Sequence, residues 1–432
     1  MMSSVSRGLS TGASGKKNLN VHWFRLGDLR LHDNPALCQS AKAEGGILPV
    51  FCFDPRIFGN DARSKFGSLK CGPRRAKFIL ESVTDLRCQL KAKGSGLVVA
   101  HGKPESVFSN LFRDMNPRIV CQEEVCSEEL RVDKAIRSTL SSGSLQTVWG
   151  STLYNLKDLP FPGEANGIPD VFTPFRNKVE KNCKIDMPMS VPHSLALPKD
   201  FEIPSMDKCS LSFMPTLEDL GYTPEQVKEA STIDPRGVME FEGGETAALE
   251  RVKDYIWTKD LLKVYFDTRN GMIGADYSTK FAPWLAHGCV SPRYIAKECR
   301  RYEETRVANK STYWVVFELL WRDFFKFFAL KHGNAIFFRE GTVGSNKRWG
   351  WDERYVRAWK EGRTGYPLVD ANMRELAATG FMSNRGRQNV CSFLAIDMNQ
   401  DWRYGADYFE SVLLDYDVHS NWGNWCSGKY LM

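Results

Sequence analysis

Short apolar runs alternate with helical stretches between residues 20 and 149, and this alternation constrains the fold more than any other feature of the sequence. Strands that are joined by helices run parallel, because each helix returns the chain to the same end of the sheet. The pattern predicts strands at residues 20–24, 46–53, 96–100 and 118–125, and amphipathic helices at 74–90 and 127–140. We therefore expect an α/β domain with a parallel sheet over residues 20–150.

The rest of the chain divides into two parts. Residues 151–243 are rich in proline and turn-forming residues, which is typical of a long connector. From residue 244 to 432 the pattern is helical, with the clearest helices at 247–257, 291–302, 313–328, 370–377 and 384–398. We expect the α/β domain to be followed by an all-α domain.

The first 19 residues are rich in Ser and Gly and contain no acidic residue. They fit a disordered tail or part of an organelle transit peptide, which leaves an organelle or the nucleus open as the compartment. No apolar stretch approaches the ~20 residues that span a bilayer, so no membrane segment is expected. The 12 cysteines form no C-x-x-C pair, and there is no H-x-x-x-H, so we expect no metal site.

Positive charge is concentrated in the helical part. Residues 251–432 contain 27 Lys and Arg against 21 Asp and Glu, whereas residues 1–250 contain 31 of each, which gives the net charge of +6. Ten of the 12 tryptophans lie from Trp257 onward. Basic and aromatic residues together suit a nucleic-acid strand whose bases can stack, although an aromatic core beneath a solvated basic surface would show the same composition.

Two segments of the helical domain combine charge with a helix boundary. The segment from Asp276 to Phe281 places two hydroxyls and a lysine ahead of a predicted helix, where a phosphate is stabilised; an ordinary helix cap is the alternative. Arg385 and Arg387 open another helix and could bind phosphate or a buried carboxylate, or lie in a basic surface turn.

Two further segments place polar residues among aromatic ones. Glu318 and Arg322 are four residues apart, which predicts either an exposed ion pair or a desolvated glutamate that faces a pocket with a raised pKa. The segment from Asp415 to Trp425 is too polar for an ordinary core, so it fits an aromatic cofactor with ring nitrogens, or a helix cap and turn.

With the N-terminal segment 23–37, these segments resemble the motifs of the photolyase/cryptochrome family, in the family's order. The matching motifs are Asp28-Leu29-Arg30-Leu31-His32-Asp33-Asn34-Pro35, Ser278-Thr279-Lys280-Phe281, Glu318-Leu319-Leu320-Trp321-Arg322, Gly365-Tyr366-Pro367, Asn384-Arg385-Gly386-Arg387 and Asp415 to Trp425. Thr268-Arg269-Asn270-Gly271 and Pro169-Asp170-Val171-Phe172 resemble its DASH-type cryptochromes most closely.

The resemblance implies a bound FAD in the helical domain. By it, Arg387 pairs with Asp415 beside the flavin ring, Asp417 meets the polar edge of the flavin or its ribose, and Asn421 lies at flavin N5. An amide there can accept a hydrogen bond from a protonated N5 or donate one to a bare N5. The remaining implied cofactor contacts are Tyr265, Ser278, Thr279, Lys280, Phe281 and Arg322.

The resemblance also implies a substrate pocket, an electron relay and an antenna. Glu318 and Trp321 match the residues that hold a pyrimidine dimer, with Asn384 and Arg385 holding the DNA. Trp425, Trp402 and Trp349 match a relay of three tryptophans from flavin to surface. Glu124 matches a contact to a folate antenna, 5,10-methenyltetrahydrofolate, although an acidic helix start is the alternative.

The expected function is FAD-dependent, blue-light-driven repair of cyclobutane pyrimidine dimers by a monomer that prefers single-stranded DNA, a deoxyribodipyrimidine photo-lyase activity. The alternative is a blue-light photoreceptor that signals through flavin photoreduction. Three departures from the family pattern qualify the resemblance, and one of them is Gln388, at a position that is Met in many dimer photolyases, a change associated with the DASH group. One extra residue lies within 23–30, and the sequence ends at Met432, shortly after Trp425, as a truncated or alternatively spliced form would.

Overall fold

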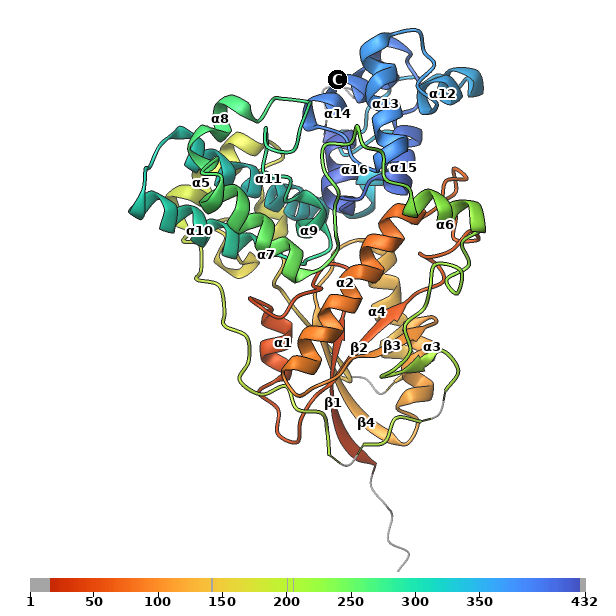
Figure 1. Ribbon diagram of the computed structural model, residues 1–432, viewed down its shortest axis with the longest axis vertical. Coiled ribbons are helices and arrows are strands. Elements are labelled where there is room, and N and C mark those ends of the chain that lie inside the picture. Colours follow the sequence, from red (N-terminus) through yellow and green to blue (C-terminus); the bar gives the residue numbers. More distant parts are fainter. Residues whose placement is uncertain (1–15, 141–142, 200, 205, 428–432) are drawn as a thin grey trace, which may run out of the picture.

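The computed structural model describes residues 16–140, 143–199, 201–204 and 206–427. An α/β domain forms one half of the molecule and a helical domain the other, with the C-terminal end in the helical half (Figure 1). No helix in this described part of the chain is long and apolar enough to cross a bilayer.

Six strands form one sheet in the order β5-β4-β1-β2-β3-β6. Neighbouring strands are parallel except β6, which is antiparallel to β3. The predicted parallel sheet is confirmed, but β1 begins at Lys17 rather than at residue 20, so part of the predicted tail belongs to the sheet and the rest, residues 1–15, lies outside the described residues. The strands are β1 (Lys17–Phe24), β2 (Leu48–Phe53), β3 (Val98–His101), β4 (Met115–Gln122), β5 (Leu145–Val148) and β6 (Cys209–Ser210).

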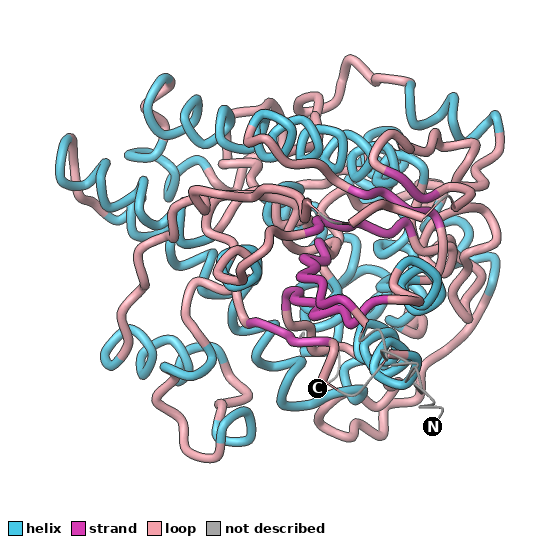
Figure 2. Tube along the Cα trace, turned by 90° about the horizontal axis from the view of Figure 1, so that it is seen from below, coloured by secondary structure: helices cyan, strands magenta, loops and turns pink. Residues whose placement is uncertain are grey.

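Apolar side chains cover both faces of the sheet, which explains why its strands appear in the sequence as continuous apolar runs. All six residues of β2 are buried. Phe51 and Phe53 join a core that extends into the helical domain, whereas Val50 and Cys52 face a separate core. Figure 2 shows the strands enclosed by helices. The covering helices are α1 (Pro35–Ser40), α2 (Pro73–Ala92), α3 (Pro104–Leu111) and α4 (Ser127–Thr139).

The helical domain is built around α11 (Lys310–His332), which packs against α8, α10 and α16. All five predicted helices are present, and two of them end in π-helical turns, at Asp254–Thr258 and Phe393–Asp397. The other helices are α7 (Glu245–Lys253), α8 (Tyr265–Thr268), α9 (Ala282–Ala286), α10 (Pro292–Thr305), α12 (Glu353–Lys360), α13 (Pro367–Thr379), α14 (Asn384–Ser392), α15 (Trp402–Val412) and α16 (Val418–Ser427).

The connector is packed along both domains rather than hanging between them. It contains α5 (Phe172–Asn182) and α6 (Pro224–Ser231) in addition to β6. Helix α5 contacts α11, and α6 contacts α2. Phe172 and Phe175 of α5 are buried in the core of the helical domain, so the connector completes that core.

The segment that follows β1 joins the two domains through buried charge. Asp33 is fully buried and accepts from Arg293 of the helical domain, Nε to Oδ2 at 2.9 Å and Nη2 to Oδ1 at 2.8 Å. The Asp33 carboxylate also accepts from Ser291 Oγ and from the Met189 backbone N–H. A buried ion pair is tolerated when its remaining hydrogen-bonding capacity is satisfied, and here it is.

Arg30 and Glu245 complete this joint. Arg30 is 1% exposed and donates to the carbonyl oxygens of Gly288, at 2.9 Å, and Asp33, at 2.9 Å. Glu245, at the start of α7, accepts from the backbone N–H groups of Leu31, at 2.6 Å, and His32, at 3.1 Å. Residues 28–35, which resemble the family's opening motif, therefore hold the two domains together.

Replacing Asp33 by Ala should destabilise the protein by about 3 kcal/mol, because it leaves the Arg293 guanidinium buried without a counter-charge. Urea unfolding followed by circular dichroism measures the loss. Asp234→Ala is the matched control, since it removes an ion pair with Arg236, whose side chain is 86% exposed, and should not move the unfolding midpoint. Equal midpoints for wild type and Asp33→Ala would show that the joint does not stabilise the fold.

Candidate functional site

The turn before α9 presents free backbone N–H groups. Arg251 of α7 is buried and donates to the carbonyl oxygens of Ala275, at 3.1 Å, Ser278, at 3.5 Å, and Thr279, at 3.0 Å. Within the described chain, none of the four N–H groups from Ser278 to Phe281 donates a hydrogen bond. Consecutive unpaired N–H groups suit an anion such as a phosphate, as the sequence predicted. Arg251 itself was not predicted.

Lys280 lies inside this turn with its ammonium nearly removed from water. The residue is 3% exposed, and its Nζ donates to Ser278 Oγ at 2.9 Å and lies 3.0 Å from the centre of the Tyr277 ring. Burial, with the nearby charge of Arg251, lowers the pKa of Lys280 to about 7. An anion bound at the turn would favour the charged form of this lysine.

Arg387 and Asp415 form the predicted ion pair. Arg387, in the first turn of α14, donates from Nη2 to both carboxylate oxygens of Asp415, at 2.9 and 2.8 Å. Its Nε donates to the Met382 carbonyl oxygen at 3.0 Å. The Asp415 side chain is only 4% exposed, so the pair forms a fixed polar group inside the helical domain.

Asp417 caps α16 and lies among cations. Its Oδ1 accepts from the Ser420 N–H at 2.7 Å and is 3.4 Å from His419 Nδ1. Burial opposes its ionisation, but His419 and Arg322 hold the pKa of Asp417 well below its usual range. The predicted helix cap is present, and the alternative prediction for this segment, a site for an aromatic cofactor, stays a prediction.

Asn421 lies one turn further along α16 and is 9% exposed. Its Nδ2 donates to the Ala406 carbonyl oxygen at 2.9 Å. No group of the described chain donates to the side-chain oxygen, and Nδ2 keeps a second hydrogen, so both the acceptor and the donor role remain open to this amide.

Glu318 pairs with Arg269 and not with Arg322. Its Oε1 accepts from Arg269 Nη1 at 2.6 Å and from Trp314 Nε1 at 3.1 Å. Burial raises the pKa of Glu318, although the Arg269 charge acts against it. The side chain is partly buried, at 34% exposure, so a desolvated carboxylate facing a pocket stays a prediction. Arg322 instead donates to the carbonyl oxygens of Ser151 and Leu285, which corrects the predicted i,i+4 pair.

Aromatic residues surround this glutamate. The ring of Trp321 stacks on Phe172 of the connector, with centroids 3.6 Å apart and planes at 10°. Tyr265, at the start of α8, is buried, and burial followed by the Glu318 charge raises its pKa. Phe172 was not predicted as a site residue, although the sequence around it was recognised.

Arg385 and Asn384 begin α14 at the same end of the domain. Asn384 is exposed, and Arg385 donates to Asn270 Oδ1 at 2.8 Å and to Gln388 Oε1 at 2.8 Å. Arg385 is thereby linked to the turn that carries Arg269, the partner of Glu318.

The three predicted relay tryptophans lie around α15. Trp402, the first residue of α15, is fully buried. Trp425 of α16 packs against Gly405, which lies one turn after Trp402 on α15. The backbone of Gly350 bonds to Asn399 and Asp401, which brings the adjacent Trp349 beside the start of α15. Trp349 is half-buried, so the set extends from the interior towards the surface.

Glu124 lies in a cleft between the domains. Its Oε2 accepts from Lys326 at 3.0 Å and its Oε1 from Gln122 at 2.7 Å. Despite burial, the charges of Lys326 and Arg25 lower the pKa of Glu124. Arg322, Asp417 and His419 line this cleft with Glu124, and within the described residues His419 Nε2 is buried without a hydrogen-bond partner.

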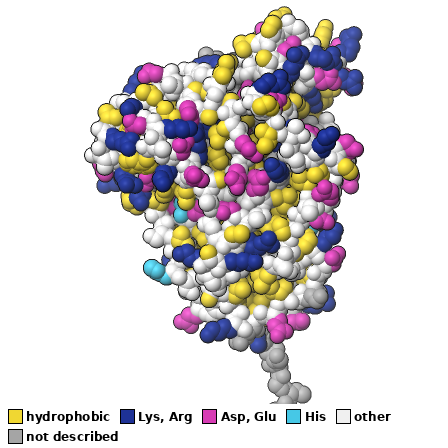
Figure 3. Space-filling view, in the orientation of Figure 1, with side chains coloured by type: hydrophobic (Ala, Val, Ile, Leu, Met, Phe, Trp, Pro, Cys, Tyr) yellow, Lys and Arg dark blue, Asp and Glu magenta, His cyan; other side chains and the backbone are white. Residues whose placement is uncertain are grey.

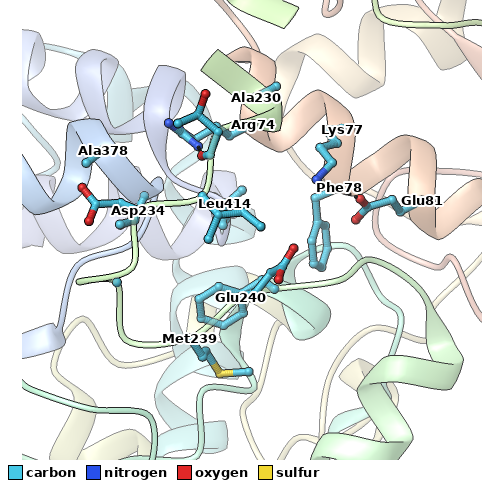
Figure 4. Close-up of a pocket in the computed structure, with 15 residues that line it drawn as sticks. Arg74, Lys77, Phe78, Glu81, Ala230, Asp234, Met239, Glu240, Ala378 and Leu414 are labelled. Carbon is cyan, nitrogen blue, oxygen red and sulfur yellow. Dashed lines mark hydrogen bonds and ion pairs between the residues drawn. The ribbon is translucent and has the colours of Figure 1, made fainter. Parts of the chain in front are cut away.

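A second hollow, of about 540 Å³, lies between α2, the connector and α13 (Figure 4). Arg74, Lys77, Glu81, Asp234 and Glu240 bring both signs of charge to its walls. None of the predicted site residues lines it.

The fold and this group of residues define a two-domain protein of photolyase type. Residues 20–194 match the family model described as DNA photolyase, and residues 314–429 match the FAD binding domain of DNA photolyase. The chain belongs to the photolyase/cryptochrome family, in its cryptochrome DASH group.

Individual relatives support this assignment. The chain is 50% identical to "Cryptochrome DASH, chloroplastic/mitochondrial" of Ostreococcus tauri over 94% of its own length and 78% of that protein. It is 49% identical to Cryptochrome DASH of Xenopus laevis over 92% and 74%. The crystal structure of a Synechocystis cryptochrome matches with a TM-score of 0.86 and 45% identity, covering 95% of this chain and 81% of that one. The predicted fold class is thus confirmed.

Lys280 should make stability depend on pH. The folded protein releases its proton near pH 7, whereas the unfolded chain holds it to about pH 10.4, so stability rises with pH in between. Relative to Lys280→Met, wild type should gain up to about 1.4 kcal/mol per pH unit from pH 7 to 9. Urea unfolding of ligand-free protein at pH 7, 8 and 9 measures the difference, and a constant difference would contradict the burial of this ammonium.

Proposed function

We propose that the protein repairs cyclobutane pyrimidine dimers in DNA under blue light with bound FAD, and that it prefers single strands. The observation that supports this most is Glu318, a partly buried carboxylate that Arg269 and Trp314 hold through Oε1. A protein that only reported light would not need a carboxylate at the position that matches the family's dimer-binding residue. The alternative function is a blue-light photoreceptor.

The residues of the helical domain fit FAD. The free N–H groups and Lys280 suit the two phosphates, with Tyr265, Ser278, Thr279 and Phe281 around them, and the Arg387–Asp415 pair suits the flavin ring. Bound and reduced, FAD supplies the excited electron that opens the dimer and takes it back afterwards. Asp417 and Arg322 would bind the cofactor's polar groups. The Asn421 side-chain oxygen would accept a hydrogen bond from N5–H.

Glu318 and Trp321 would hold the dimer, while Asn384 and Arg385 would hold the strand. Photolyases extrude their target from the duplex, which costs a few kcal/mol and least in single strands. The net charge of +6 attracts the DNA phosphates only modestly, so it offsets little of the cost of extruding the dimer from a duplex. On the side of the molecule that Figure 3 shows, Lys and Arg are interspersed with Asp and Glu over the helical domain.

Trp425, Trp402 and Trp349 would reduce the flavin by passing electrons inward from the surface. Their placement from a buried to a half-buried position favours such a relay. The relay also suits the alternative function, since a receptor that signals through photoreduction needs it.

Glu124 would contact a folate antenna, as its place in the family's motifs implies. We further propose that the protein acts as a monomer. The relatives from Ostreococcus tauri and Arabidopsis thaliana are named as chloroplastic/mitochondrial, which supports an organelle as its location.

The test of repair compares two substrates and two variants. Illuminated, reduced wild type should restore thymine absorbance in dimer-containing single strands much faster than in duplex, because the flipping cost is lower. Glu318→Ala should slow repair about tenfold or more while bound FAD stays constant. Glu180→Ala is the matched control: Glu180 accepts from Tyr313 Oη at 2.7 Å and, at 33% side-chain exposure, resembles Glu318 at 34%.

Two outcomes would contradict the proposal. Equal repair of both substrates would overturn the preference for single strands. No repair of either by FAD-loaded protein would favour the photoreceptor.

A further inference from the structure

The turn after α8 lies between the two groups to which we assign DNA contacts. Arg269 follows the last residue of α8, and the chain then runs towards the start of α14 (Figure 1). Arg269 bonds to Glu318, and the next residue, Asn270, bonds to Arg385. Two adjacent residues thus contact a proposed dimer-binding side chain and a proposed strand-binding side chain.

Arg269 restrains only one oxygen of Glu318. Oε1 accepts from Arg269 and from Trp314, and no residue of the described chain donates to Oε2. Arg269 is itself held over the Trp314 ring, 5.1 Å from its centre. With Oε1 fixed from two directions, the carboxylate plane is set and Oε2 remains available to a hydrogen-bond donor.

Asn270 restrains the direction of Arg385. The Asn270 side chain accepts from Nη2, and Gln388 accepts from Nη1 on the other side. A guanidinium on an exposed helix start would otherwise sample many rotamers, and ordering a long side chain on binding costs free energy. Holding Arg385 in advance reduces that cost.

We propose that Arg269 and Asn270 are positioning residues for the substrate site, with Arg269 orienting Glu318 towards the damaged bases and Asn270 orienting Arg385 towards the strand. This rests on the proposed function. Arg269 serves recognition of the lesion, because a hydrogen bond to a base edge distinguishes bases. Asn270 serves affinity for any strand, because a phosphate contact carries no base information.

Binding of fluorescent single strands, with and without one thymine dimer, tests these separate roles in the FAD-loaded protein in the dark. Arg269→Gln should weaken binding of the dimer strand about tenfold and leave the undamaged strand unchanged. Arg269→Lys keeps the charge and should recover most of this loss. Asn270→Ala should weaken both strands by the same factor, about threefold.

Arg306→Gln is the matched control for Arg269, because Arg306 Nη1 makes an ion pair of the same 2.6 Å length with Asp260. It should bind both strands as wild type does. A loss in this control equal to that of Arg269→Gln would assign the effect to stability and overturn the positioning role.

A double-mutant cycle then shows whether Arg269 acts through Glu318. If it does, Arg269→Gln should have less than about a twofold further effect in a Glu318→Gln background. Independent, multiplying effects would overturn the inference. If wild type binds dimer and undamaged strands equally, the proposed function fails and the inference with it. A different result would overturn the inference alone. In that case wild type prefers the dimer strand and Glu318→Gln abolishes the preference, but Arg269→Gln retains it.

Discussion

The buried polar joint between the two domains is the constraint on which the rest of the structure depends. Asp33 binds Arg293, and Glu245 caps the backbone of residues 31 and 32, so the segment after β1 is fixed to the start of the helical domain. Gly288 approaches so closely that a side-chain carbon there would lie 1.9 Å from the Gly27 carbonyl oxygen. Burying these charges is costly unless every group is paired, and this requirement selects one relative placement of the domains.

That placement positions α11, and α11 in turn positions most of the site. Asp323 is fully buried and accepts from the backbone N–H groups of Leu153 and Tyr154, which anchors the helix to the segment after β5. Arg322 and Lys326, on the same helix, contact Ser151. Glu318 and Trp321 are one turn away. The polar joint and the anchored helix therefore fix the part of α11 that carries Glu318, which contacts Arg269, and Trp321, which stacks on Phe172.

Strands and helices that depend on local sequence patterns could be predicted from the sequence. Contacts between residues far apart in the chain could not. The strands and long helices follow from apolar periodicity, and the Arg387–Asp415 pair follows from a resemblance that carries spatial information. The partner of Glu318 could not be predicted in the same way, because Arg269 is 49 residues away and Arg322 lies nearer in sequence. Arg251 was missed because its targets are backbone carbonyl oxygens, which leave no pattern in side-chain identity.

We infer that the turn from Ser278 to Phe281 and the Arg387–Asp415 pair together form a flavin site. Titration of purified, flavin-depleted protein with FAD, followed by flavin fluorescence, tests it most directly. We expect one FAD to bind per chain of wild type, and the affinity to fall about tenfold or more in Asp415→Ala, which leaves Arg387 without its partner. Unchanged affinity in Asp415→Ala, or no binding in wild type, would contradict it.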